Sequence, residues 1–196
     1  GLAETLGLAF IPFALPREIP GATGVRLDAI GTHSKLGALW HGRPEVANLV
    51  YEWNEAQCLS AFDFHYVAAS RRRSSARWNS MIVFWAPKVA IPRFTLSAET
   101  IGDFAIWGDD PDIDFDTHPR FSLLYALNGT DEASIREFFS PQLLGLFERE
   151  ASLFVGGEWR GGDGAMMFRL NHRREPAEFV RVLSKCRSVW NLANDA

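Results

Sequence analysis

Apolar and polar positions alternate most clearly over residues 58–70. Three aromatic residues there are separated by Asp63 and His65, a period of two that is typical of a strand with one apolar and one polar face. The segment 78–87 is apolar at almost every position, which predicts a central strand covered on both faces. Shorter strand patterns occur at 50–51, 93–98 and 120–129, and in a hairpin whose turn lies at 161–164.

Helical spacing of three and four residues is clearest near the end of the chain, over 175–192. The apolar positions there form one stripe, which predicts the core-facing side of a long helix. These positions are Phe179, Val182, Leu183, Cys186, Val189 and Trp190. An earlier helix is expected to be capped by Thr130 or Asp131. Another is expected to begin at the pair Ser140 and Pro141, with serine as the cap and proline in the first turn.

The connecting segments are less regular. Short helices are expected at 2–9 and just before Trp107. The segment 54–57 reads as a hairpin turn, since Asn54 tolerates a left-handed backbone. The polar, basic segment 71–77 is flanked by two strand patterns and is predicted to be a hairpin loop.

The order of these elements predicts an α+β fold, with a mostly antiparallel sheet built from hairpins and short helices packed on it. Strands follow one another in hairpins instead of alternating with long helices, which argues against a doubly wound fold. The length of 196 residues is typical of one domain, so we interpret 1–196 as a single soluble domain. The chain begins at Gly1 inside an amphipathic pattern, which favours a fragment that lacks an N-terminal membrane anchor.

Composition narrows the classes of function. The formal net charge is -4, which gives no support to a nucleic-acid partner. Aromatic residues make up 13%, and such large side chains need a thick core, a ligand groove or a partner surface. Cys58 and Cys186 lack metal-ligand spacing and are expected to be buried thiols, although their number alone permits a disulfide. The sequence has no nucleophile or phosphate-binding motif, so no catalytic residue and no cofactor is assigned.

The segment 109–121, DDPDIDFDTHPRF, holds five carboxylates and one histidine and is the strongest chemical lead. Alternate residues of an extended segment share one face, which would bring several oxygen ligands together. The candidate metal ligands are Asp112, Asp114, Asp116 and His118. An EF-hand calcium loop is rejected, because its sixth and twelfth positions lack the required glycine and glutamate.

A structural turn is the favoured interpretation of this segment. Ile113, Phe115 and Phe121 are expected to point inward, because they offer the apolar area that holds the segment down. The carboxylates are expected to be exposed, since several buried together would repel one another. Asp116 is expected to accept a hydrogen bond from a backbone N–H near His118.

Two further groups of polar residues are candidate sites. The basic cluster consists of Arg71, Arg72, Arg73 and Arg77. It would fit an anionic membrane surface or an acidic partner, or it is a solvated hairpin tip. The neighbouring Asp63 and His65 could orient an imidazole for base catalysis, but such pairs on a solvated strand face are common and inert.

One longer pattern extends over 112–148: an acidic turn, a segment P-x-F-x-x-x-Y-x-L-x-G, an acidic helix start, and a proline followed by two apolar residues. The residues that carry it are Asp112, Ile113, Phe115, Pro119, Phe121, Tyr125, Leu127, Gly129, Asp131, Phe139, Pro141, Leu143 and Leu144. This pattern resembles the soluble domain of bacterial membrane-anchored proteins of unknown function, and the segments 65–67 and 92–99 are also similar. The resemblance implies an N-terminal membrane anchor and carries over no active-site residue.

Three hypotheses of function follow. The leading one is a non-enzymatic binding or assembly domain of a bacterial membrane-associated protein, whose partner is a membrane surface or another protein and not a nucleic acid. The second is a domain that binds a lipid or another apolar small molecule, with the aromatic residues lining the site. The third is a metal-dependent hydrolase centred on Asp112 to His118. The sequence leaves open the side of the membrane, the oligomeric state and the identity of the ligand.

Overall fold

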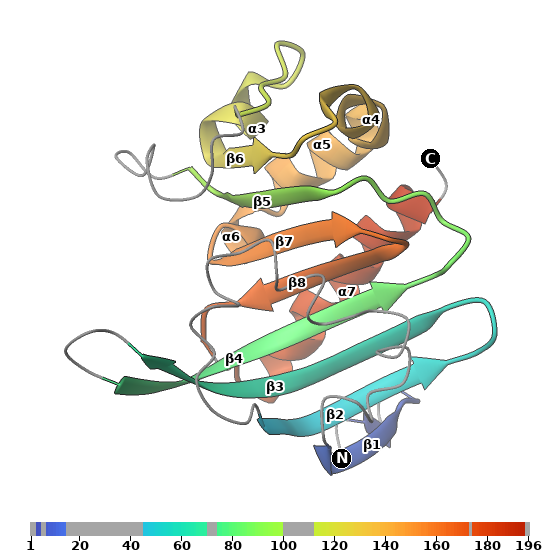
Figure 1. The fold of residues 1–196 in the computed structure, drawn as a ribbon, viewed down its shortest axis with the longest axis vertical. Helices are drawn as coiled ribbons and strands as arrows, with labels where there is room; N and C mark the ends of the chain where they lie inside the picture. The colour runs from blue at the N-terminus through green and yellow to red at the C-terminus, as the bar shows by residue number, and fades with distance from the viewer. Residues whose placement is uncertain are drawn as a thin grey trace.

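An eight-stranded antiparallel sheet forms the centre of the computed structural model (Figure 1). The structure describes residues 3–4, 7–14, 45–69, 74–99, 112–172 and 174–194. The strands lie in the order β1-β2-β3-β4-β8-β7-β5-β6, and each neighbouring pair is antiparallel. The α+β prediction, with its mostly antiparallel sheet and short helices, is therefore confirmed.

The elements have the following bounds. The strands are β1 (Ala9–Ala14), β2 (Glu45–Trp53), β3 (Cys58–Ala69), β4 (Ser74–Trp85), β5 (Phe94–Ala98), β6 (Tyr125–Asn128), β7 (Gly157–Gly162) and β8 (Ala165–Leu170). The helices are α3 (Pro119–Leu124), α4 (Glu132–Phe138), α5 (Pro141–Arg149), α6 (Ala151–Phe154) and α7 (Pro176–Asn194). None of the helices in the described ranges is long and apolar enough to cross a membrane.

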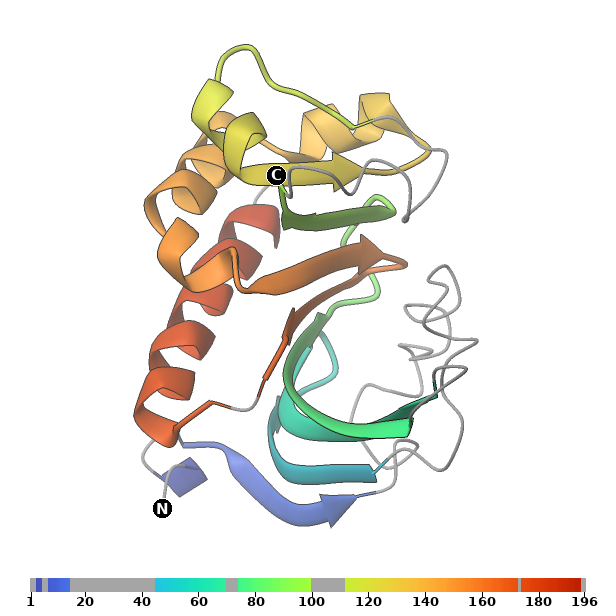
Figure 2. The same ribbon diagram turned by 90° about the vertical axis from the view of Figure 1, so that its left-hand side faces the viewer.

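Two separate clusters of buried side chains lie on the two faces of the sheet. The larger one, here called the helix-face core, includes every buried side chain of α3 to α7. The second lies on the opposite face, here called the helix-free face because none of the described helices packs on it. It contains Val46, Leu49, Phe62, Phe64, Met81, Val83, Ala165 and Met167. Figure 2 shows the long helix α7 along one side of the sheet, with β1 to β4 curling so that their concave side is the other face. The described helices thus bury one face and not the other.

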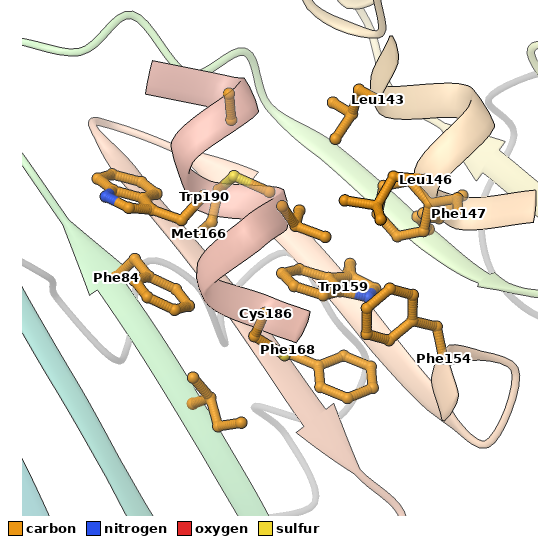
Figure 3. Close-up of a cluster of buried hydrophobic side chains, with 14 of the residues drawn as sticks. Phe84, Leu143, Leu146, Phe147, Phe154, Trp159, Met166, Phe168, Cys186 and Trp190 are labelled. Atoms are coloured by element: carbon orange, nitrogen blue, oxygen red, sulfur yellow. The ribbon is translucent and has the colours of Figure 1, made fainter. Parts of the chain in front are cut away.

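Aromatic side chains build the centre of the helix-face core. The Trp159 indole stacks on Phe168 with ring centroids 4.7 Å apart, and the rings of Phe147 and Phe154 meet it edge-on. In Figure 3 the indole nitrogen of Trp159 lies next to the Phe154 ring. This N–H is buried without a hydrogen-bond acceptor.

Two glycines of β7 make room for these rings. Gly157 and Gly161 point to the same face as Trp159, which lies between them along the strand. A Cβ at Gly157 would lie 2.5 Å from the Phe168 ring, and one at Gly161 would lie 2.2 Å from the Phe94 ring. The close approach of two aromatic rings to the strand therefore depends on glycine at both positions.

The predicted turns are present, with one difference in how they are made. In the β2–β3 turn the Asn54 side chain accepts hydrogen bonds from the backbone N–H groups of Ala56 and Gln57, at 2.8 and 3.0 Å. Asn54 therefore acts through its side chain and not through a left-handed backbone. In the β7–β8 turn Asp163 and Gly164 have φ of 52° and 74°, which is the conformation that a two-residue hairpin loop requires.

The helix signals were accurate. The predicted apolar stripe of α7 is buried at all of its positions. Asp131 caps α4 by accepting from the Ser134 N–H at 3.1 Å, and Ser140 caps α5 by accepting from the Leu143 N–H at 3.4 Å. Cap residues act within one turn of chain, which explains why sequence alone located them.

Three local predictions were wrong. Ala9, predicted to be the end of a helix, is instead the first residue of β1, because β2 supplies an antiparallel partner. The predicted strand over 120–129 starts as helix α3, whose Phe121 N–H donates to Glu148 of α5 at 3.0 Å. The basic loop is shorter than predicted, since β4 already begins at Ser74. The helix expected before Trp107 lies outside the described residues.

Candidate functional site

The acidic segment 112–118 lies beside β6 and is anchored by its apolar side chains. Ile113 and Phe115 are buried, and the Phe115 ring packs edge-on against Phe121, which is also buried. Asp112, Asp114 and Asp116 are exposed. These orientations confirm the predicted arrangement for the described part of the segment; Asp109 and Asp110 lie outside it.

Hydrogen bonds tie this segment to the edge of the sheet. The Leu127 N–H donates to Oδ1 of Asp112 at 2.7 Å, and the Ile113 N–H donates to the Leu127 carbonyl at 2.8 Å. The predicted cap by Asp116 is wrong, because the His118 N–H donates to the carbonyl of Phe115 at 2.9 Å. Asp112 is therefore the acidic residue whose carboxylate satisfies a backbone group of the sheet.

The carboxylates of this region repel one another. Burial raises the pKa of Glu99, and the charges of Asp112 and Asp114 raise it further. Although the residue as a whole is exposed, partial burial of its carboxyl group raises the pKa of Asp112; the Leu127 N–H lowers it in part, and the charge of Asp114 raises it. The imidazole Nδ1 of His118 lies 3.1 Å from the Thr117 hydroxyl. Within the ranges that the structure describes, no group of three or more His, Cys, Asp or Glu side chains could hold a metal ion.

The basic cluster falls largely outside the described residues. Arg71, Arg72 and Arg73 are not described, and Arg77 is placed through its backbone, which pairs with Tyr66 across β3 and β4. A membrane or partner contact at these arginines therefore stays a prediction.

The Asp63 carboxylate is buried, contrary to the solvated strand face that its alternation with aromatic residues predicted. It is 8% exposed and accepts hydrogen bonds from Ser80 Oγ and Asn48 Nδ2, both at 2.8 Å. Asn48 sits at an irregularity of β2 with φ of 54°, which directs its amide toward β3. The His65 ring stacks on Trp78 with centroids 4.7 Å apart. Asp63 and His65, the candidate pair for base catalysis, thus have different partners on neighbouring strands.

A charged cluster that the sequence analysis missed lies on the helix-free face, across β7 and β8. Glu158 is 8% exposed, and its carboxylate binds two guanidinium groups. Arg160 donates from Nε and Nη2 to Oε1, and Arg169 donates from Nη2 to Oε2. The side chains of Arg160 and Arg169 are 11% and 20% exposed. The Nε–H of Arg169 is buried without an acceptor. These three residues are here called the arginine–glutamate cluster.

Strand register defines what surrounds this cluster. Residues directly opposite each other in an antiparallel pair share a face of the sheet. Arg169 lies opposite Met81 on one side and Glu158 on the other, while Arg160 lies opposite Met167 and Thr95. Both methionines belong to the apolar cluster of the helix-free face. The arginine–glutamate cluster therefore lies between apolar side chains of β4 and β8 and hydroxyl groups of β5.

The alternation of charged and apolar residues in the sequence indicates part of the arginine–glutamate cluster. Glu158 and Arg160 flank Trp159, and Arg169 lies between two apolar residues, as expected for charges on one face of a strand. The sequence does not give the register of β7 against β8, and that register is what brings Arg169 to Glu158.

Both cysteines are free and buried, as predicted. Burial raises the pKa of Cys186 well above its ordinary value. Burial also raises the pKa of Cys58; a hydrogen bond with Ser60 lowers it in part, and the charge of Glu52 raises it. Both thiols are therefore protonated at neutral pH, where the thiolate would be the reactive form.

The fold and this chemistry define an α+β chain whose described helices cover one sheet face and whose other face carries a buried apolar cluster beside the arginine–glutamate cluster. No family model, no curated protein and no solved structure matches the chain.

Proposed function

We propose that this chain is a non-enzymatic binding domain of a bacterial membrane-associated protein. We further propose that it binds an apolar or amphipathic molecule, such as a lipid, on the helix-free face. The observation that carries this proposal is that this face combines buried apolar side chains of β2, β3, β4 and β8 with the hydroxyl-bearing side chains of β5 and the charged side chains of the arginine–glutamate cluster. Ligand sites commonly combine a mostly apolar lining with a few polar groups in this way.

The acidic segment 112–118 also supports this proposal, because its structure argues against the hydrolase hypothesis. A hydrolase centred there would need its carboxylates free to bind a metal or move a proton. Asp112 instead accepts the Leu127 N–H, and the side chains of Ile113 and Phe115 hold the segment in the core. This use of the segment as a structural turn favours binding over metal-dependent hydrolysis.

Ligand-dependent stability tests the proposal. A ligand that binds the folded chain and not the unfolded one stabilises the fold, by about 2.7 kcal/mol at a ligand concentration 100 times Kd. This stabilisation raises the melting temperature. Single-chain amphiphiles below their micelle concentration are expected to raise the melting temperature of the 196-residue chain. No shift with any amphiphile, together with no co-sedimentation with lipid vesicles, would contradict the proposal.

A contact between the arginines of the β3–β4 connection and an anionic membrane is a second candidate, from the resemblance and the basic composition of 71–77. The residues to change are Arg71, Arg72, Arg73 and Arg77. Replacing all four with serine is expected to abolish binding to acidic vesicles and to leave amphiphile-induced stabilisation unchanged. Equal binding of the unaltered chain to neutral and acidic vesicles would remove this candidate.

A further inference from the structure

We propose that the outer edge of β1 pairs with β1 of a second copy of this chain, so that the two sheets join across a two-fold axis. β1 forms one end of the sheet and β6 forms the other (Figure 1). A strand at the end of a sheet presents a row of backbone N–H and C=O groups, which is a template for a further strand. This inference concerns an edge of the sheet and is independent of ligand binding on the helix-free face.

The edge at β6 is closed by the chain itself. Asp112 forms a bridge with Asn128 there, and the Leu127 N–H donates to Oδ1 of Asp112 at 2.7 Å. The Ile113 N–H donates to the carbonyl of Leu127 at 2.8 Å. Because the acidic segment occupies both backbone groups of Leu127, a second chain cannot pair with this residue.

The edge at β1 is open. Among the strands that the structure describes, only β2 pairs with β1. Ala9 and Pro12 are exposed, and Phe10 is 53% exposed. β1 has no charged side chain, although charged residues commonly protect an edge strand against pairing. Pro12 is its one protective residue, and it removes a single N–H donor from the strand.

The composition of β1 favours a second copy as the partner. Self-pairing places like residues close together, so a charge in β1 would repel its own counterpart. The strand avoids this repulsion because its sequence, AFIPFA, is apolar throughout. The closed edge at β6 also limits the assembly, because a chain with one open edge forms a complete dimer and cannot extend into a fibre.

Strand geometry defines the register of this pairing. Opposite residues of an antiparallel pair share a face of the sheet, so the two-fold axis must pass through a residue and not between two residues. An axis at Pro12 would place two residues that lack an N–H opposite each other. An axis at Ile11 instead places Phe10 opposite Pro12 of the second copy. The two copies of Phe10 then become diagonal neighbours, about 7–8 Å apart.

The oligomeric state of the unaltered chain is the first measurement. β1 has six residues, which is few for a protein interface, so Kd is expected to be on the order of 10–100 micromolar. Sedimentation equilibrium of the 196-residue chain between about 5 and about 500 micromolar covers this range. The expected result is a reversible equilibrium between monomer and dimer, without larger species.

Charge substitutions at Phe10 then test the pairing itself. Phe10→Lys and Phe10→Glu each place like charges on diagonal neighbours, so each is expected to weaken the dimer at least about tenfold. An equimolar mixture of the two variants is expected to restore the dimer, because opposite charges then become neighbours. Leu123→Lys is the matched control: Leu123 is 75% exposed on α3, near the other end of the sheet, and its change is expected to leave the dimer unaltered (Figure 1).

Three outcomes would overturn the proposal. A chain that stays monomeric over the whole concentration range has no second copy at β1. A dimer that neither Phe10 variant weakens uses another surface. If both variants weaken the dimer and their mixture does not recover it, the two copies of β1 do not meet across a two-fold axis.

Discussion

The two faces of the sheet differ in what fills them. The helix-face core is a continuous set of apolar side chains from strands and helices, dominated by interlocking aromatic rings around Trp159. The helix-free face has a smaller apolar cluster from strands alone and carries the arginine–glutamate cluster beside it. Apolar burial accounts for most of the stability of a fold, whereas buried charges contribute little to it. The first face therefore stabilises the domain, and we assign binding to the second.

The largest expected effect comes from the aromatic centre of the helix-face core. The Phe147 ring is fully buried and contacts Phe121, Tyr125 and Trp159. Phe147→Ala is expected to lower the free energy of unfolding by about 3–5 kcal/mol, through lost transfer energy and a residual cavity. Chemical denaturation measures this change. Leu123→Ala is the control, because Leu123 is 75% exposed and its loss is expected to change little; similar costs for both would contradict the assignment.

Gly161 tests how closely the rings approach β7. A Cβ there would lie 2.2 Å from the Phe94 ring and 2.9 Å from Ile91, so Gly161→Ala is expected to cost about 1–3 kcal/mol by overpacking. Gly156→Ala is the matched control, because its nearest contact would be at 3.5 Å, with Arg174. Thermal melts of the two variants should differ clearly. A tolerated alanine at Gly161 would show that Phe94 does not cover this strand as described.

Arg169→Leu sharpens the contrast between the faces. Glu158 keeps its bonds to Arg160 when Arg169 is removed, and leucine matches the apolar neighbour Met81. The free energy of unfolding is therefore expected to change by less than about 1 kcal/mol. A loss of more than about 3 kcal/mol in denaturant melts would mean that the cluster stabilises the fold, and the two faces would no longer differ in role.

The smallest expected effect concerns pH and Asp112. Its pKa is raised above the ordinary value of 3.8 by burial first and by the charge of Asp114, so the native state disfavours its ionised form. The contribution of Asp112 to the free energy of unfolding is therefore fully present below pH 3.8, where the side chain is protonated, and is lost as pH rises through the raised pKa. Asp112→Asn keeps an acceptor for the Leu127 N–H and removes the charge.

The unaltered chain should therefore lose stability relative to Asp112→Asn as pH rises above 3.8. Urea melts of both proteins across this range measure the difference. A difference that is constant with pH would show that the pKa of Asp112 is not shifted in the folded state.

Sequence reasoning succeeded where one segment determines its own structure. The α7 stripe, the caps Asp131 and Ser140, and the turn at Asp163 and Gly164 all depend on residues within a few positions of each other. These elements, together with the order of the strand patterns, were enough to predict the α+β class.

Sequence reasoning failed where distant segments decide the outcome. In helix α3, the Phe121 N–H donates to Glu148 of α5, a contact that no local pattern shows. Asp63 is buried because Asn48 and Ser80 reach it from the two neighbouring strands. The acidic segment is recognisable in the sequence because its charges are close together along the chain. The arginine–glutamate cluster forms across two strands, so it depends on their register, which the sequence does not show.

The central claim, that binding takes place on the helix-free face, is tested most directly by nuclear magnetic resonance of the arginine side chains. The Nε–H signal of Arg169 reports on a donor that has no acceptor in the structure. On titration with decyl phosphate, this signal and the backbone amides of β5, β7 and β8 are expected to shift together and saturate. Shifts confined to the acidic segment 112–118, or an unchanged Arg169 signal at saturating ligand, would contradict it.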